Sequence, residues 1–323
     1  MPAFPVLPMT VLVTGGTGFV GRHLVPHLAQ HGLPVRVPVR DRKTVPSAWE
    51  TLQGVEIVPM PARSDAFDAI ITGVSGVVHL AGLAAVPTGP DAEMRLRAAN
   101  VDLTTDLVAA ARRHSVRQFL FLSSIRAVVG SASSNTIDDA SAAQPVEPYG
   151  RSKLAAEEAV GAFAEPSRLA ISLRAPLIIG PDAGGNWRRL QQLAASGAWL
   201  PFAGIRNRRS YLAVETVCAA ILHLLEGNWT SDASGSYCLA DPEALSLPKV
   251  IGAMRDGLGH PRRLFALPGL SWTAALPGLS GPAQSLFGSL PVDASRFRER
   301  FHFASPHPLA ERIALAASPD RGR

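Results

Sequence analysis

Cysteine is scarce in this chain, and its scarcity excludes one broad class of protein. The 323 residues contain two cysteines, Cys218 and Cys238. Two thiols so far apart make neither a disulfide framework nor a cysteine-based metal site. We therefore expect two buried thiols in a reducing cytoplasm and no bound metal.

A secretory signal is also missing, because residues 1–9 carry neither a basic segment nor an apolar core. The longest uncharged stretch, residues 265–292, has enough residues to span a bilayer. Prolines and glycines interrupt it, and lipid cannot satisfy the carbonyl groups that proline leaves unpaired. We expect a cytoplasmic protein with no membrane span, and we interpret residues 265–292 as a lid over a ligand.

Acidic residues are the minority among the charged ones, with 26 Asp and Glu against 31 Lys and Arg and a net charge of +5. A basic balance favours an anionic partner. The arginines around Arg188 and Arg206 do not alternate with aromatic residues, as a surface that stacks nucleic-acid bases would. We therefore expect a small anionic ligand such as a nucleotide, and no nucleic acid.

What the chain does have is a regular alternation of strand and helix patterns up to about residue 180. Short β-branched runs predict strands at 10–14, 35–39, 55–58, 77–80, 118–122 and 170–174. Helical spacing predicts helices at 19–28, 67–71, 92–114 and 148–163. This alternation indicates an α/β fold with a doubly wound parallel sheet, Rossmann-like in type.

The alternation stops after residue 180, where proline, glycine and arginine become frequent. We predict a dinucleotide-binding domain over 1–180. Residues 181–323 are predicted to form mostly a smaller C-terminal substrate lobe, with some return to the sheet around 205–240. Helices are expected near 187–196, 214–225 and 247–258, and the ligand at the carboxyl ends of the strands, between the lobes.

The segment TGGTGFVG at 14–21 lies between the first strand and the first helix. In that position each glycine has a role: Gly15 allows a tight turn, Gly18 a close approach of a pyrophosphate, and Gly21 close packing of the helix. The free N–H groups of the helix N-terminus favour an anion. The loop therefore predicts a bound dinucleotide.

The end of the second strand predicts which dinucleotide is bound. An acidic side chain there would accept hydrogen bonds from the 2′-hydroxyl of NAD. That position is Val39, followed by Arg40, and an arginine is suited to the 2′-phosphate of NADP. NADP is therefore favoured over NAD, the alternative being an ordinary solvated basic loop.

Tyr149 and Lys153 lie four residues apart in a predicted helix and so share one face. A phenol is a poor base at neutral pH, and a neighbouring ammonium should lower its pKa. Ser123 and Ser124 end the fifth strand, where a hydroxyl could orient a substrate oxygen. We favour Ser124, with Ser123 as the alternate and a purely strand-ending role as the remaining interpretation.

Six motifs occur in one order: TGGTGFVG, VVHLAG at 77–82, Asn100 with the two residues after it, FLSSI at 121–125, PYGRSK at 148–153 and LRAPLIIGP at 173–181. Together they resemble the extended short-chain dehydrogenase/reductase family, in particular its nucleoside-diphosphate-sugar epimerases and dehydratases. The segment 205–221 resembles bacterial epimerases and 4-keto reductases of polysaccharide biosynthesis.

The resemblance implies Ser124, Tyr149 and Lys153 as catalytic residues, with Tyr149 as the acid/base. It implies a dimer formed through the helices that contain Asp102 and Lys153. It also implies that Asn186 and Arg209 bind the substrate diphosphate, although an ordinary surface role remains open for Arg209. The implied cofactor-binding residues are Gly15, Thr17, Gly18, Phe19, Val20 and Gly21 at the pyrophosphate, Leu80 and Ala81 at the adenosine, and Asn100 and Pro176 near the nicotinamide and its ribose.

The sequence departs from the usual family pattern at Ile125, Pro61 and Leu177. Ile125 occupies the usual position of the catalytic hydroxyl, so that role is assigned to Ser124. Ile125-Arg126 stands where a 4,6-dehydratase would need an acidic pair. The leading hypothesis is an NAD(P)-dependent 4-epimerase or 4-keto reductase acting at C4 of a nucleotide-linked sugar. The alternatives are an NADP-dependent ketone reductase of the hydroxysteroid type and a non-catalytic dinucleotide sensor.

Overall fold

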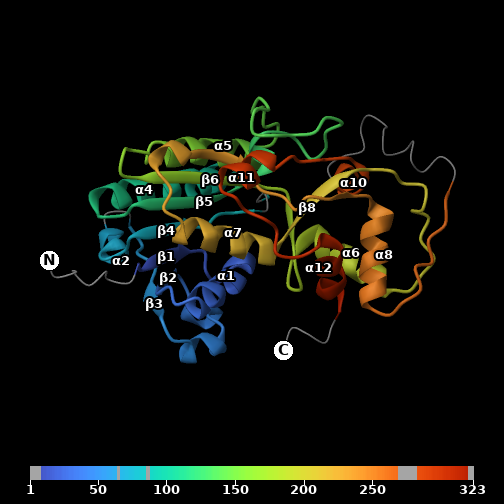
Figure 1. The fold of residues 1–323 in the computed structure, drawn as a ribbon, viewed down its shortest axis with the longest axis horizontal. Helices are drawn as coiled ribbons and strands as arrows, with labels where there is room; N and C mark the ends of the chain where they lie inside the picture. The colour runs from blue at the N-terminus through green and yellow to red at the C-terminus, as the bar shows by residue number, and fades with distance from the viewer. Residues whose placement is uncertain (1–8, 64–65, 85–87, 268–281, 319–323) are drawn as a thin grey trace. The chain divides into compact units, whose positions relative to one another are not determined.

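The computed structural model describes residues 9–63, 66–84, 88–267 and 282–318 (Figure 1). The chain divides into two compact units. Unit 1 comprises Met1–Ser123, Arg151–Leu173 and Ala220–Ser236, and unit 2 comprises Ser124–Gly150, Arg174–Ala219 and Tyr237–Arg323. The units therefore interleave along the chain, whereas the sequence analysis placed one main boundary near residue 180.

A seven-stranded sheet forms the framework, with the strand order β3-β2-β1-β4-β5-β6-β9. The central strands β1 and β4 are buried along their whole length and pair in parallel, with Thr14 opposite His79. Their β-branched, apolar residues suit a sheet that is covered on both faces. The strands are β1 Val11–Thr14, β2 Val35–Val39, β3 Val55–Pro59, β4 Gly76–His79, β5 Gln118–Ser124, β6 Leu169–Ala175 and β9 Gly235–Cys238.

The predicted doubly wound sheet is confirmed, and its first six strands lie where the sequence patterns placed them. The order reverses between β1 and β4, the position where open α/β sheets bind ligands at the carboxyl ends of the strands. The seventh strand, β9, lies at one edge of the sheet, beside β6.

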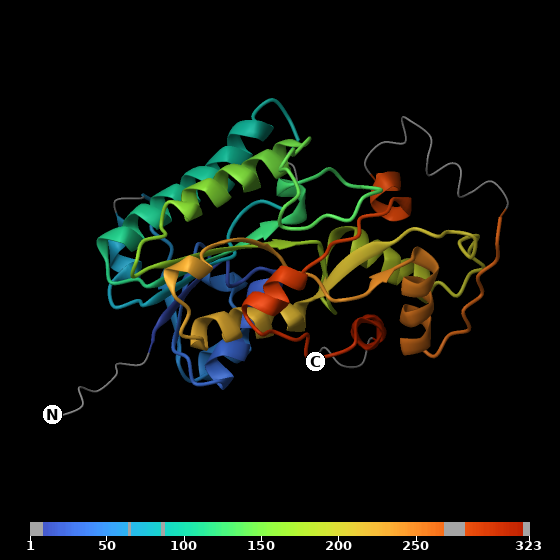
Figure 2. The same cartoon turned by 45° about the horizontal axis from the view of Figure 1, so that its top comes forward.

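Helices cover both faces of this sheet. On one face α4 (Leu103–Arg113) and α5 (Pro148–Gly161) share an apolar cluster with β5 (Figure 2). Leu107, Val160 and Phe119 are among the buried members of this cluster. On the other face lie α1 (Phe19–Gln30) and α7 (Val214–Glu226), and the Leu225 side chain packs at Gly76 (Figures 1 and 2).

The helix predicted over 92–114 is interrupted in its middle. It consists of α3 (Ala92–Arg97), a π-helical turn (Ala98–Asp102) and α4. Such wide turns are rare and frequently occur at functional sites. Here the turn contains Asn100, which is buried.

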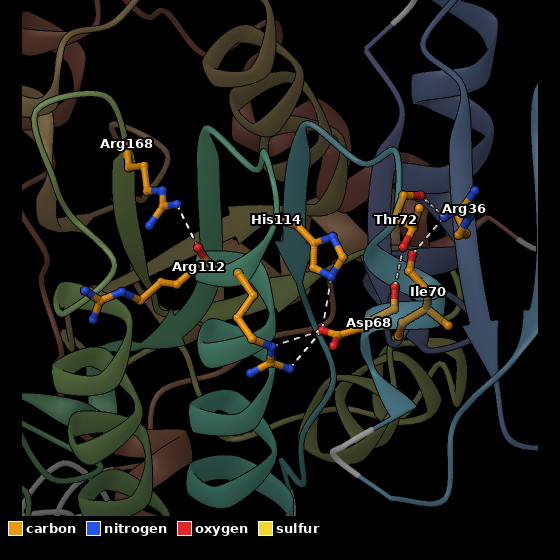
Figure 3. Close-up of polar contacts among 8 residues, drawn as sticks. Arg36, Asp68, Ile70, Thr72, Arg112, His114 and Arg168 are labelled. Atoms are coloured by element: carbon orange, nitrogen blue, oxygen red, sulfur yellow. Dashed lines mark hydrogen bonds and ion pairs between the residues drawn. The ribbon is translucent and has the colours of Figure 1, made fainter.

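Polar contacts fix the short helix α2 (Asp68–Ile71) in unit 1 (Figure 3). Arg36 of β2 donates to the carbonyl oxygens of Ile70 and Thr72, at 3.0 and 2.8 Å. Asp68 accepts from Arg113 at 2.8 Å, and its carboxylate lies 3.1 Å from His114 Nε2. The two hydrogen bonds from Arg36 satisfy carbonyl groups that the end of α2 would otherwise leave unpaired.

Unit 2 contains a three-stranded sheet of order β10-β8-β7. Pro176 separates β6 of the large sheet from β7 of the small one. No helix among the described residues is long and apolar enough to cross a membrane. The bounds are β7 Leu177–Ile179, β8 Arg209–Ala213, β10 Ala244–Leu245, α6 Gly185–Ala195, α8 Leu247–Gly257, α10 Pro282–Phe287, α11 Ser295–Arg300 and α12 Leu309–Ala317. The lid interpretation of residues 265–292 falls in part on 268–281, which lie outside the described residues.

Candidate active site

The glycine loop connects β1 to α1 in a conformation that leaves the helix N-terminus open. Gly15 has a positive φ of 71°, a conformation that glycine adopts without steric cost. Gly18 N donates to Gly15 O at 3.0 Å and Gly18 precedes α1 without a side-chain cap. The first N–H groups of α1 are therefore left for a ligand, since a helix cannot satisfy them itself.

The loop glycines differ in what surrounds them. A Cβ on Gly21 would overlap the backbone of Gly15 and Gly16, so Gly21 permits close packing. A Cβ on Gly18 would meet only the Gly15 carbonyl oxygen, at 3.2 Å, and Gly18 is exposed. Gly18 thus leaves open the surface where a pyrophosphate would approach.

The residues after β4 lie beside this loop. A Cβ on Gly15 would lie 2.6 Å from the Ala81 nitrogen, so Leu80 and Ala81 occupy the same edge of the sheet as the loop. Arg40 follows β2 and is exposed. These positions fit a dinucleotide, with the pyrophosphate at the start of α1 and the adenosine toward β2.

His79 at the end of β4 joins a chain of buried hydrogen bonds. Its Nδ1 lies 2.6 Å from the Thr14 hydroxyl, and its Nε2 lies 2.9 Å from the Thr104 hydroxyl. Because Thr104 donates its proton to the Asn100 carbonyl at 2.6 Å, His79 must donate from Nε2 and accept at Nδ1. Burial lowers the pKa of His79 to about 3, so the imidazole is neutral.

The Asn100 side chain is held entirely by protein groups. Its oxygen accepts from Leu83 N at 2.7 Å, and its nitrogen donates to Leu83 O at 3.1 Å and to the Ser152 hydroxyl at 2.9 Å. The family resemblance implied a position near the nicotinamide ribose for Asn100. In the structure Asn100 joins the segment after β4 to helix α5, the helix that carries Lys153.

The two serines at the end of β5 have different partners. Ser123 donates to the buried carboxylate of Glu157. The Ser124 hydroxyl accepts from Arg126 N at 3.2 Å and is hydrogen-bonded to the Tyr149 hydroxyl. Of the two candidates, Ser124 is therefore the hydroxyl that the structure brings to Tyr149.

Lys153 is buried on α5, one turn after Tyr149. Its ammonium donates to Leu122 O at 2.9 Å and lies 4.5 Å from the centre of the Phe121 ring. Burial lowers the pKa of Lys153 to about 8, and the charge of Glu157 opposes that shift. Glu157, which also accepts from the Ser236 hydroxyl at 3.1 Å, is one turn further along α5.

The pKa of Tyr149 is raised above its ordinary value, chiefly because burial disfavours the phenolate. The hydrogen bond from Ser124 and the charge of Arg126 act in the opposite direction. The spacing of Tyr149 and Lys153 predicted a lowered pKa of Tyr149, caused by the Lys153 ammonium. That prediction was wrong in its net direction, because burial outweighs the charge, and the cation that lowers the value is Arg126.

The predicted substrate residues are found in unit 2 in different settings. Asn186 is exposed in the first turn of α6. Arg209 is buried, and its guanidinium donates to Gly288 O at 3.1 Å and to Ser131 O at 3.0 Å. The alternative of an ordinary surface arginine is therefore wrong for Arg209. Pro176 is buried between its two strands.

Unit 2 also contains a cavity of about 420 Å³. Apolar side chains, among them Val128 and Ile137, line much of it, and Glu147 and Gln284 contribute polar groups. Glu147 forms an ion pair with Arg126. The cavity lies beside the polypeptide that leads to Tyr149, and its apolar wall can take a nonpolar substituent.

Several residues around the site were not identified from the sequence. Thr104 and Glu157 each lie one helical turn after a residue that was identified, Asn100 and Lys153, so helical spacing could have indicated them. The pairing of Arg126 with Glu147 left no such signal, because it joins two loop ends that are far apart in the sequence.

Comparisons with known proteins show which family the chain belongs to. The model of the NAD dependent epimerase/dehydratase family matches residues 11–240. The UDP-glucose 4-epimerase of Vibrio cholerae is 28% identical over 320 residues, which cover 94% of this chain and 93% of that protein. The ceramide reductase of Caulobacter vibrioides is 35% identical over 213 residues, 66% of this chain and 59% of that protein.

A solved structure shows the same fold. The UDP-glucuronic acid 4-epimerase of Bacillus cereus, in complex with NAD, superposes with a TM-score of 0.77 at 15% identity and covers 96% of this chain and 95% of that one. The family model covers well over half of the chain, and it begins at β1 and ends just beyond β9. This chain belongs to the NAD-dependent epimerase/dehydratase family, the extended short-chain dehydrogenases/reductases.

Proposed function

We propose that this protein is a nucleotide-sugar 4-epimerase or 4-keto reductase, acting at C4 of a sugar linked to a nucleoside diphosphate. The observation that carries the proposal is the hydrogen bond between Ser124 and Tyr149, with Lys153 one turn further along the same helix. The similarity to UDP-glucose 4-epimerase over nearly the whole chain supports the substrate class.

In this proposal each residue has a defined part. Bound NAD(P) supplies a hydride acceptor or donor at its nicotinamide. Ser124 orients the C4 oxygen of the sugar, and Tyr149 takes the proton of the C4 hydroxyl during oxidation or returns it during reduction. Lys153 contributes a positive charge on the face of α5 that Tyr149 shares. Asn186 and Arg209 are proposed to bind the substrate diphosphate.

The dinucleotide is proposed to contact the loop Gly15–Gly21 together with Leu80, Ala81 and Pro176. NADP rather than NAD remains our proposal for the preferred form, supported by the exposed Arg40 after β2. Binding of NAD and NADP, compared by calorimetry for the native protein and for Arg40→Ser, tests it. A native preference for NADP that disappears in Arg40→Ser supports the proposal, and a native preference for NAD contradicts it.

The activity is tested by incubating the purified protein with UDP-, GDP- and dTDP-sugars, or with their 4-keto forms and NADPH. We expect C4 epimers or oxidation of the reduced nicotinamide. Tyr149→Phe should abolish turnover and still bind the dinucleotide, whereas a non-catalytic sensor would keep its whole function in this variant. No turnover with any of these compounds would refute the sugar proposal.

A second candidate, a reductase of hydrophobic ketones, is favoured by the similarity to ceramide reductase. The apolar wall of the cavity in unit 2 is compatible with such a substrate. Parallel assays with long-chain and steroid ketones separate the two candidates, because a sugar-specific enzyme leaves these compounds unchanged.

We also propose a homodimer formed through the helices that contain Asp102 and Lys153, and a place in polysaccharide biosynthesis. Sedimentation of the purified protein tests the dimer. A monomer at micromolar concentration would contradict it.

A further inference from the structure

Arg126 lies in the 3-10 turn Ile125–Ala127, directly after β5 and in the same compact unit as Tyr149. Its backbone N–H donates to the Ser124 hydroxyl, which in turn is hydrogen-bonded to Tyr149. A Cβ on Gly150 would overlap the Arg126 carbonyl oxygen, so the first turn of α5 packs directly on the Arg126 backbone. This packing fixes Tyr149 close to Arg126.

Within the part of the chain that the structure describes, the guanidinium of Arg126 has one partner of opposite charge. Its Nη2 forms an ion pair with Glu147, which lies two residues before Tyr149. Its Nε is buried and has no hydrogen-bond partner among the described residues. The Arg126 side chain is 20% exposed, so water screens its charge only in part.

Besides Lys153, which lies one turn after Tyr149 on α5, two other titratable groups belong to this environment. Burial lowers the pKa of Arg209, nearby Tyr211 acts in the opposite direction, and the charge of Arg126 is close enough to lower that pKa further. Arg209 uses its terminal nitrogens on the carbonyls of Ser131 and Gly288, and Tyr211 is buried. Glu147 is therefore the acidic partner that the structure gives to Arg126.

We propose that Arg126 and Glu147 form an electrostatic pair that sets the proton affinity of Tyr149. Arg126 stabilises the phenolate, and Glu147 limits that effect by neutralising part of the guanidinium charge. Both act through Tyr149 and are positioning residues. The consequence of this pair for catalysis rests on the proposed function. Its electrostatic effect on Tyr149 does not, because that effect is a property of the protein without substrate.

The chain offers a direct measurement, because it contains only three tyrosines. Tyrosine ionisation is followed by ultraviolet absorbance against pH in the full-length protein without substrate, and Tyr149→Phe identifies the transition that belongs to Tyr149. Removing the cation with Arg126→Met should move that transition to higher pH. Removing the carboxylate with Glu147→Gln should move it to lower pH, and Arg126→Lys should leave it near its native position.

Opposite shifts of the Tyr149 transition distinguish this pair from an ion pair with only a structural role. Removing either partner of a structural ion pair would disturb the protein in the same way and so shift the transition in one direction. The exposed pair Arg262 and Asp256, in the same unit, provides the control, and Arg262→Met should leave the Tyr149 transition in place. Unchanged transitions in both variants, or shifts in one direction, would overturn the proposal. Should Arg126→Met not fold, Glu147→Gln decides alone, since anything but a lower transition contradicts the inference.

Activity provides a second measurement. For oxidation of an alcohol near neutral pH, Arg126→Met should reduce kcat by about tenfold with little change in KM, and a higher pH should restore the rate. The titration needs no substrate, so its result stands even if no sugar nucleotide is turned over. Failure of the proposed function and failure of this inference are therefore separate outcomes.

Discussion

The side-chain nitrogen of Asn100 donates a hydrogen bond of 2.9 Å to the hydroxyl of Ser152. Asn100 belongs to the π-helical turn between α3 and α4, and Ser152 immediately precedes Lys153 on α5. The same side chain makes two hydrogen bonds to the backbone of Leu83. One buried amide thus connects the segment after β4 with the helix that carries Lys153.

Asn100→Ala should reduce stability, because it leaves the Leu83 N–H and C=O groups without their partner. We expect a loss of about 2–4 kcal/mol in the free energy of unfolding, measured by urea denaturation. Thr105→Ala, which removes an exposed hydroxyl bonded to Val101 O, is the control and should cost less than about 1 kcal/mol. Equal stability of the two variants would contradict the positioning role of Asn100.

The glycine loop predicts that a substitution at Gly18 weakens cofactor binding, whereas a substitution at Gly21 weakens folding. Gly18→Ala should fold normally, since its Cβ meets only one atom, but should bind the dinucleotide at least about tenfold more weakly. Gly21→Ala should instead destabilise the protein by about 2 kcal/mol or more, because its Cβ overlaps two backbone groups.

Calorimetric titration with NAD and NADP measures the first effect, and thermal unfolding measures the second. Gly161→Ala is the matched control, since Gly161, like Gly18 and Gly21, has no positive φ, and nothing lies within 4 Å of its Cβ position. Undiminished binding by Gly18→Ala would show that the pyrophosphate does not approach this residue.

The different partners of Ser123 and Ser124 predict different defects. Ser124→Ala should lower kcat about a hundredfold, because the hydroxyl orients the reacting oxygen. Its cost in stability should stay within about 1 kcal/mol, since Arg126 N loses its acceptor. Ser123→Ala should mainly reduce stability, by about 1–2 kcal/mol, since the buried Glu157 loses a donor. Steady-state kinetics and denaturation of both variants provide the test, and the reverse assignment of defects would refute our choice of Ser124.

His79 predicts how stability depends on pH. Its folded pKa of about 3 lies below the unfolded value of 6.5, so between these values the unfolded chain binds a proton that the folded protein does not. The stability that neutral His79 contributes is therefore present near neutral pH and is lost as the pH falls. Between about pH 7.5 and about pH 5, this loss should lower the free energy of unfolding by about 2 kcal/mol.

His79→Gln should show a correspondingly smaller loss over the same interval, measured by urea denaturation at both pH values. Exposed His302, outside this hydrogen-bond chain, supplies the control His302→Gln, which should keep the native pH dependence. An identical pH dependence in the native protein and His79→Gln would show that His79 is not held neutral.

The sequence by itself determined the architecture of the large sheet and the spacing of the candidate site residues. Strand and helix periodicity depends on neighbours a few residues apart, and it gave the first six strands of the sheet. The glycines at 15, 18 and 21 and the pair Tyr149 and Lys153 have fixed spacings within one turn or one helix. These local patterns were enough to predict the glycine loop and the helix face that Tyr149 and Lys153 share, because neither depends on long-range contacts.

Only the tertiary structure decided which hydroxyl meets Tyr149, which proton form His79 adopts, and in which direction the pKa of Tyr149 shifts. It also showed that Asn100 bonds to Leu83 and Ser152, and that Arg126 is paired with Glu147. Each of these depends on burial and on partners distant in the chain. Desolvation and hydrogen bonding act across space rather than along the sequence, so residue spacing could not predict them.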